Sequence, residues 1–160
     1  MNKPANRGLL RAVAILGTAV ALATVFAMPG LATTPSGFTS AVVARGTDKS
    51  EGTVVFKEGT DVVVARNVFD VGGSSGWHSH PGGAIVVIVQ GEVTIYRSVG
   101  NHCDVHTYTA GQTFIERPSA ILDAVNTSSG QTMVYATFPS VPVGGLSRID
   151  RANPGTCPGI

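Results

Sequence analysis

The chain has 160 residues, of which 43% are hydrophobic and 13% are charged, and its formal net charge is +1 at neutral pH. This length suits a single domain with a real hydrophobic core, so we do not expect a second domain. Lys and Arg form no cluster in the chain, which argues against electrostatic binding of nucleic acid or anionic lipid, and we expect neither partner.

The N-terminal segment has the pattern of an export signal. Basic residues among the first eleven precede an uncharged apolar run, residues 12–28, and Gly30, Leu31 and Ala32 supply the small residues that a signal peptidase accepts. We interpret residues 1–32 as a signal peptide and expect a secreted or extracytoplasmic protein with no stable membrane insertion after cleavage. The alternative is an uncleaved membrane anchor, although the run is short for a transmembrane helix.

A linker rich in Thr, Ser, Pro and Gly, residues 33–40, precedes a series of short runs rich in Val, Ile, Thr, Phe and Tyr. Glycine-containing turns separate these runs, and no stretch after residue 40 has helical periodicity, so the runs predict strands. The expected strands are residues 41–45, 53–57, 61–71, 84–90, 92–98, 105–110, 112–116, 121–126 and 131–138. They indicate an all-β antiparallel sandwich or barrel over residues 41–140, with a C-terminal tail, residues 141–160, on its surface.

Both cysteines of the chain, Cys103 and Cys157, lie in the exported part. An even number of cysteines in an oxidising compartment predicts a disulfide, which would hold the Pro- and Gly-rich tail against the domain. The alternatives are two free thiols, or a metal site shared with His102 or His106.

The stretch GWHSHPGG, residues 76–83, contains two histidines, His78 and His80, one residue apart. Residues i and i+2 of a strand project from the same face, so the two imidazoles can point together into a barrel. Such a pair is a frequent beginning of a metal site but supplies only half of one. The alternative is a pair of polar side chains at the mouth of a strand.

The residues around this pair resemble the first cupin motif, G-x5-H-x-H-x3-E-x6-G. The matching residues are Gly72, His78, His80 and Gly91. Gly111 and Asn126 match the ends of the second cupin motif, G-x5-P-x-G-x2-H-x3-N. The resemblance covers roughly residues 62–138, and the segment 45–83 as a whole is similar to small exported bacterial cupins. It implies a single antiparallel cupin (jelly-roll) β-barrel.

The chain departs from both motifs at metal-ligand positions. Ala84 stands at the glutamate position of the first motif, and Leu122 stands at the histidine position of the second. The resemblance therefore implies a divalent metal such as Zn, Mn, Fe or Ni, held weakly by His78 and His80 alone. Asp123 adjoins the vacant histidine position, but strand alternation should turn it away from the cup when Leu122 faces inward.

Three functions remain open at this point. The first is the binding of a small molecule in an apolar cup, with His78 and His80 giving polar orientation. The expected lining residues are Ala84, Val86, Leu122, Ala124 and Tyr135. The second, implied by the resemblance, is a metal-dependent enzyme of oxygenase or isomerase type, for which no catalytic residue is nominated. The third is a non-catalytic structural or assembly module, in keeping with the homodimers that the resemblance implies.

Overall fold

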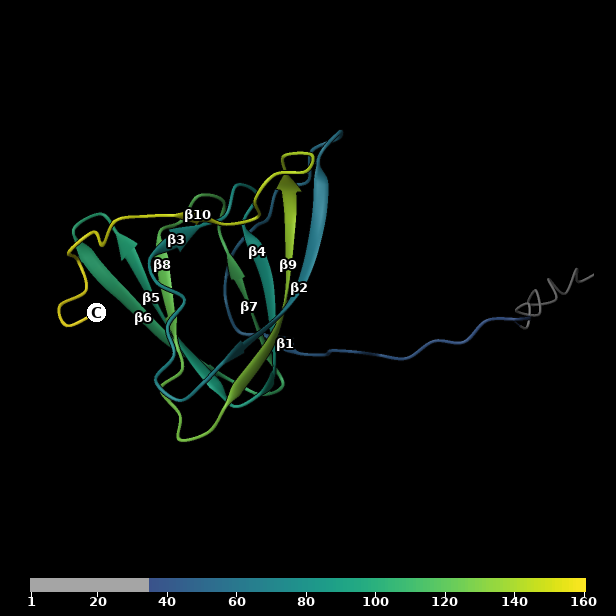
Figure 1. The fold of residues 1–160 in the computed structure, drawn as a ribbon, viewed down its shortest axis with the longest axis horizontal. Helices are drawn as coiled ribbons and strands as arrows, with labels where there is room; N and C mark the ends of the chain where they lie inside the picture. The colour runs from purple at the N-terminus through teal and green to yellow at the C-terminus, as the bar shows by residue number, and fades with distance from the viewer. Residues whose placement is uncertain (1–34) are drawn as a thin grey trace, which may run out of the picture. The chain divides into compact units, whose positions relative to one another are not determined.

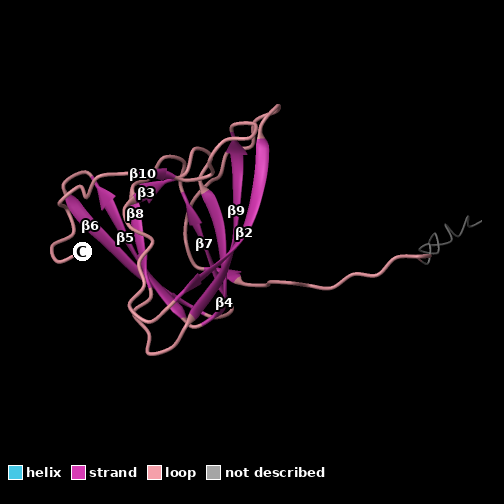
Figure 2. Ribbon diagram, viewed as in Figure 1, coloured by secondary structure: helices cyan, strands magenta, loops and turns pink. Residues whose placement is uncertain are grey.

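A computed structural model describes residues 35–160, and residues 40–160 form one compact unit (Figures 1 and 2). The predicted signal peptide, residues 1–32, lies outside the described residues. The strands, in chain order, are β1 (Thr47–Asp48), β2 (Asp61–Phe69), β3 (His78–Ser79), β4 (Ala84–Gln90), β5 (Glu92–Val99), β6 (His102–Thr109), β7 (Gln112–Glu116), β8 (Leu122–Val125), β9 (Thr132–Val141) and β10 (Ile149–Asp150). Within residues 35–160 we find no helix with the length and apolar character needed to cross a membrane.

The strands form two five-stranded sheets, in the orders β1-β7-β4-β9-β2 and β10-β3-β8-β5-β6. Every neighbouring pair of strands is antiparallel except β1 and β7, which form a short parallel pair. Figure 1 shows the sheets facing each other, closer together at one end and wider apart at the end where β3 and β10 lie. The prediction of an all-β fold built from antiparallel strands is confirmed.

Most predicted strands are present, but two are not. Residues 41–45 and 53–57 form no strand, and Val42 and Val43 are exposed. Both runs contain residues that favour strands, yet a strand also needs a neighbour for its backbone hydrogen bonds. The short strands β1, β3 and β10 were not expected, because their residues carry no run of apolar or β-branched side chains.

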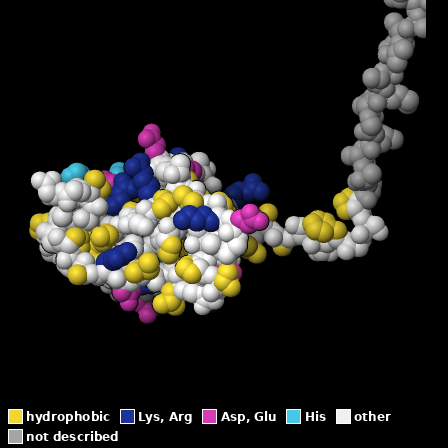
Figure 3. Space-filling view, turned by 90° about the horizontal axis from the view of Figure 1, so that it is seen from above, with side chains coloured by type: hydrophobic (Ala, Val, Ile, Leu, Met, Phe, Trp, Pro, Cys, Tyr) yellow, Lys and Arg dark blue, Asp and Glu magenta, His cyan; other side chains and the backbone are white. Residues whose placement is uncertain are grey.

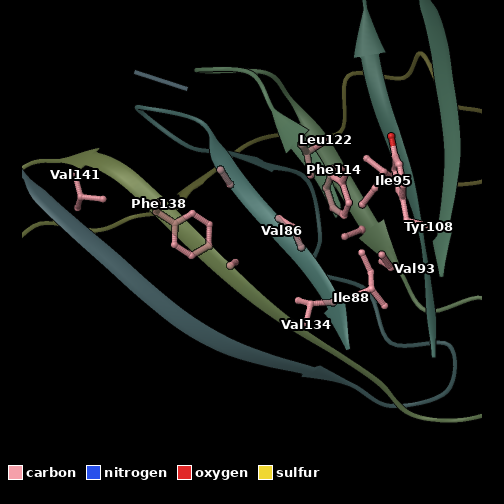
Figure 4. Packing of buried hydrophobic residues seen from close by; sticks show 13 residues of the cluster. Val86, Ile88, Val93, Ile95, Tyr108, Phe114, Leu122, Val134, Phe138 and Val141 are labelled. Carbon is pink, nitrogen blue, oxygen red and sulfur yellow. The ribbon is translucent and has the colours of Figure 1, made fainter. Parts of the chain in front are cut away.

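The hydrophobic core lies between the two sheets (Figure 4). Strand β9 shows a clear alternation, in which Val134, Ala136 and Phe138 are buried in the core. Tyr135 lies between them in the sequence, and its Cα partner on β2 is Arg66, which is exposed on the outer face. The structure therefore corrects the prediction for Tyr135, whose side chain faces away from the cup because consecutive strand residues point to opposite faces.

The disulfide between Cys103 and Cys157 is present, as predicted, and joins the C-terminal segment to β6. Residues 142–157, which we call the C-terminal strap, cross the wider end of the sandwich (Figure 1). Within the strap, β10 pairs with β3, and the amide of Arg151 donates a hydrogen bond to the carbonyl of Trp77. The strap thus completes the second sheet beside the histidine pair.

Reducing this disulfide should lower the melting temperature while leaving the β-sheet signal in circular dichroism unchanged. The bond links residues 54 apart in sequence. By the chain-entropy model, closing a loop of that size contributes about 4 kcal/mol, mostly through the unfolded chain. A variant with serine at both positions should melt at the lower temperature, and adding reductant should not change its melting temperature. Free thiols in protein taken from an oxidising compartment would contradict this prediction.

Candidate metal centre

Two backbone carbonyls orient the histidine pair. His78 Nδ1 lies 2.7 Å from the carbonyl oxygen of Gly76, and His80 Nδ1 lies 2.6 Å from the carbonyl oxygen of Ser147 in the C-terminal strap. A carbonyl only accepts hydrogen bonds, so each Nδ1 carries the proton and donates it. Each Nε2 is left with a free lone pair, which is the form of imidazole that binds a metal.

The third member of the cluster is Glu116, the last residue of β7. Phe114 and Glu116 are two residues apart on this strand, and both side chains are buried on the face turned toward the cavity. The turn before β4 allows this approach, because Gly83 has a φ of +81° and an added Cβ there would lie 2.3 Å from the carbonyl oxygen of Glu116. Any side chain at position 83 would force β4 away from the end of β7.

Glu116 and His80 face each other without a satisfactory hydrogen bond. Glu116 Oε2 lies 3.2 Å from His80 Nε2, yet this buried oxygen has no hydrogen-bond partner with acceptable geometry among the described residues. Since His80 carries its proton on Nδ1, two lone pairs meet across this gap. Such an arrangement needs a proton on the carboxyl group or a cation between the two atoms.

Burial sets the protonation of the cluster. It raises the pKa of Glu116 to about 8, and it lowers the pKa of His80 to about 4. The pKa of His78 is also lowered, mainly by burial, although its hydrogen bond to Gly76 acts in the opposite direction. In the metal-free protein at neutral pH, all three groups are therefore uncharged.

The donor set fits a divalent transition metal. The ligand atoms of His78, His80 and Glu116 all lie within 4.8 Å of one another, and all three residues are buried. Two imidazoles with one carboxylate are the donors that suit Fe, Mn and Zn, and Glu116 supplies the negative charge that a two-histidine site lacks. The predicted metal residues are brought together, and the sequence-based prediction missed their third partner.

Glu116 occupies the space that a carboxylate at position 84 would otherwise fill. Ala84 of β4 and Glu116 of β7 are directly paired across the sheet, and Ala84 is fully buried. Side chains of directly opposed residues lie on the same face about 5 Å apart. The small side chain of Ala84 therefore leaves room for the carboxyl group that arrives from the neighbouring strand.

A cavity of about 490 Å³ opens beside the cluster. Its wall includes His78, His80 and Glu116, as well as two residues predicted for the cup, Val86 and Ala124. The remaining lining residues are Ala65, Arg66, Asn67, Val68, Phe69, Ser74, Ser75, Val93, Phe114, Val134, Ala136, Phe138, Ser147 and Arg148. Eight of these fourteen side chains are apolar and six are polar or charged, so the cavity suits a small molecule that has both an apolar part and a polar part.

Three predicted lining residues do not line the cavity: Tyr135 faces away from it, and Ala84 and Leu122 are buried elsewhere. Ala84 belongs to the hydrophobic core. Leu122 is 1% exposed and borders a second, much smaller cavity that Glu116 also borders. Both residues stand at positions where the cupin motifs place metal ligands. Their apolar side chains pack in the interior and stabilise the site, and they do not border the main cavity.

The alternative metal ligands do not join the cluster. Asp123 is buried and does not border the cavity. Its side chain turns away from the cavity, as strand alternation predicted. There it accepts hydrogen bonds from Ser74 at 2.8 Å and from Ser75 at 3.1 Å. His106 is more than half exposed and its Nε2 lies 2.9 Å from Asp104, while His102 is exposed at the start of β6.

The family model described as a cupin domain matches residues 65–138, which contain all three residues of the cluster. Residues 65–138 are a cupin domain. A comparison with curated proteins finds no match. Among solved structures, this cupin is similar to an oxalate oxidase in complex with the substrate analogue glycolate, with 25% identity, a TM-score of 0.45, and coverage of 49% of this chain and 42% of the other.

Two further solved structures are similar to this cupin. One is a cupin-like protein from Thermotoga maritima, with 21% identity, a TM-score of 0.44, and coverage of 50% of this chain and 58% of the other. The other is the formate complex of the oxalate decarboxylase from Lactobacillus farciminis, with 18% identity, a TM-score of 0.49, and coverage of 57% and 27%. The chain thus spans less than half the length of the oxalate oxidase that it matches.

Two features of this cupin explain how it departs from the second motif. Ser119 takes the place of the motif's glycine and has a positive φ of 59°, and its amide donates a hydrogen bond to the carbonyl of His80. Glu116 lies directly before the position of the motif's proline. Strand alternation pairs Glu116 with the apolar Phe114, and this was the one signal in the sequence that could have identified the third ligand.

Proposed function

We propose that this cupin binds a divalent transition metal through His78, His80 and Glu116, and acts as an enzyme on a small molecule held in the adjacent cavity. The observation that carries the proposal is the meeting of three buried lone-pair donors at the cavity wall, two of them oriented by backbone carbonyls. A site with three protein ligands leaves coordination positions free, which is typical of catalytic rather than structural metal sites.

The metal, when bound, supplies a Lewis acid that polarises an oxygen atom of a ligand. The chain's own residues supply the surroundings. Phe69, Phe114 and Phe138 pack against apolar parts of the ligand, while Asn67 offers a half-buried amide at the cavity wall. We propose that Asn67 orients the ligand.

The same proposal places this enzyme outside the cytoplasm. The disulfide between Cys103 and Cys157 supports export, because such bonds persist mainly in oxidising compartments. The apolar N-terminal segment of the sequence supports it independently.

The test is the metal content of the full chain after purification without chelators. We expect about one divalent metal ion per chain by mass spectrometry, because the carboxylate compensates the charge of the ion. Replacing His78 and His80 together by alanine should remove the metal. His106→Ala is the matched control, since this exposed histidine lies outside the cluster. Metal that is absent from the unmodified protein, or that persists in the double variant, would refute the proposal.

A further inference from the structure

Arg148 is the one cationic side chain that the strap brings to the cavity wall. It follows Ser147, whose carbonyl holds His80, and it precedes β10, which pairs with the strand of His78. Its position beside the metal centre is therefore set by backbone contacts on both sides. The other arginine at the wall, Arg66, lies at an outward-facing, exposed position of β2.

The guanidinium group of Arg148 has N–H donors that form no hydrogen bond within the described residues. Its Nη2 donates to the carbonyl of Ser75 at 2.6 Å, and its Nε donates to Asp150 at 2.7 Å. A guanidinium carries five N–H donors, so three remain without an acceptor among the described residues. Asp150 is 84% exposed and screened by water, whereas the Arg148 side chain is 39% exposed at the cavity. The charge of Arg148 is thus only partly compensated.

The balance of charge in the cavity favours an anion. Glu116 is the one carboxylate among the lining residues of the described chain, and a bound divalent metal would more than offset it. On the face seen in Figure 3, Lys and Arg side chains are scattered among hydrophobic ones and form no broad basic surface.

We propose that the ligand of this cupin is a small carboxylate with an apolar body, whose carboxylate group is bound by Arg148. The inference rests on the proposed function, and it adds the class of ligand that the cavity selects. Arginine matches the geometry of a carboxylate through parallel hydrogen bonds, and the phenylalanine side chains of the wall match an apolar body. Arg148 is then a specificity-determining residue carried by the strap and absent from both cupin motifs.

The experiment compares acids with their neutral amides by titration calorimetry at pH 7 and low salt. The probes are benzoate with benzamide, phenylacetate with phenylacetamide, and hexanoate with hexanamide. In the unmodified full chain, the acid of at least one pair should bind at least about tenfold more tightly than its amide, because hydrogen bonds to a charged partner are the stronger ones. Arg148→Gln should bring the acid down to the affinity of the amide and leave the amide unchanged.

Two variants separate the charge of Arg148 from the placement of the strap. Arg148→Lys should keep part of the preference for the acid, since it keeps the charge but not the planar pair of donors. Arg151→Gln is the matched control, because Arg151 lies on the same strap, binds Ser79 and does not border the cavity. The inference is overturned if no acid is preferred, if the preference survives in Arg148→Gln, or if this variant weakens acid and amide equally.

The titrations are repeated on protein stripped of metal, which separates the two proposals. A preference for the acid that depends on Arg148 and persists without metal supports the inference even if the metal content refutes the proposed function. Bound metal without any preference for the acid overturns the inference and leaves the proposed function standing.

Discussion

Replacing Glu116 by glutamine should lower the affinity for a divalent metal at least about 100-fold. Loss of a residue that only orients a ligand costs about 10- to 100-fold in metal affinity, and Glu116 is itself one of three ligands. Glutamine keeps the size of the side chain but removes the negative charge that offsets the ion. Equilibrium dialysis against a metal-specific dye measures the change, and Glu92→Gln is the matched control, because Glu92 lies outside the cluster on β5.

The pairing of Ala84 with Glu116 allows a sharper version of this experiment. Exchanging the two residues, Ala84→Glu with Glu116→Ala, moves the carboxylate to the directly opposed position on β4. We expect the exchanged protein to recover most of the affinity that Glu116→Ala loses, because opposed side chains share one face of the sheet. Full metal binding by Glu116→Gln would show that the carboxylate is not a ligand, and the three-ligand site would have to be abandoned.

The metal-free protein should lose stability as the pH rises from about 6.5 to about 8. In the folded chain Glu116 keeps its proton up to a pKa of about 8, whereas its ordinary pKa is 4.5. The folded state therefore binds more protons than the unfolded state within this window, and a rise in pH favours unfolding. Each pH unit contributes about 1.4 kcal/mol, so the loss should reach about 2 kcal/mol.

His80 explains why the loss should begin only near pH 6.5. Its pKa falls from 6.5 to about 4 on folding, so the folded state binds fewer protons between these values and a rise in pH there favours folding. This gain opposes the loss from Glu116 up to about pH 6.5. Above that value the loss from Glu116 is unopposed.

Thermal melts in the presence of chelator, over pH 5 to pH 9, measure this dependence. Glu116→Gln lacks the one group of the cluster that titrates in the folded protein between pH 6.5 and pH 8, so its melting temperature should stay nearly level in that window. Added metal should remove the decline in the unmodified protein, since the metal binds the ionised carboxylate. An unmodified, metal-free protein whose stability does not fall above pH 6.5 would contradict the raised pKa of Glu116.

Several features of this cupin follow from the sequence alone. Alternating β-branched runs between glycine turns predict the long strands, because this pattern has no competing helical interpretation. The two cysteines predict their bond, because only one pairing within the chain is available. His78 and His80 were identified because residues two apart on an extended chain share a face whatever the rest of the fold does.

The direction of Tyr135 shows where the pattern is ambiguous. In β9, one set of alternate residues contains Val134, Ala136 and Phe138, and the other contains Met133 and Tyr135. Both sets are apolar enough to face a core. Only the register of β9 against β4 and β2 decides between them, and a shift of one residue exchanges the two faces.

The third ligand and the strap were decided by tertiary structure. Glu116 reaches the histidines because β7 pairs with β4, and a single sequence does not state which strands become neighbours. Ser147 and Arg148 reach the site because the chain returns across the end of the sandwich to β3 and to the disulfide. The periodicity of a sequence indicates the face of a strand on which a side chain lies. A metal site depends instead on distances between segments that are far apart in the chain. Only the packing of the two sheets sets those distances.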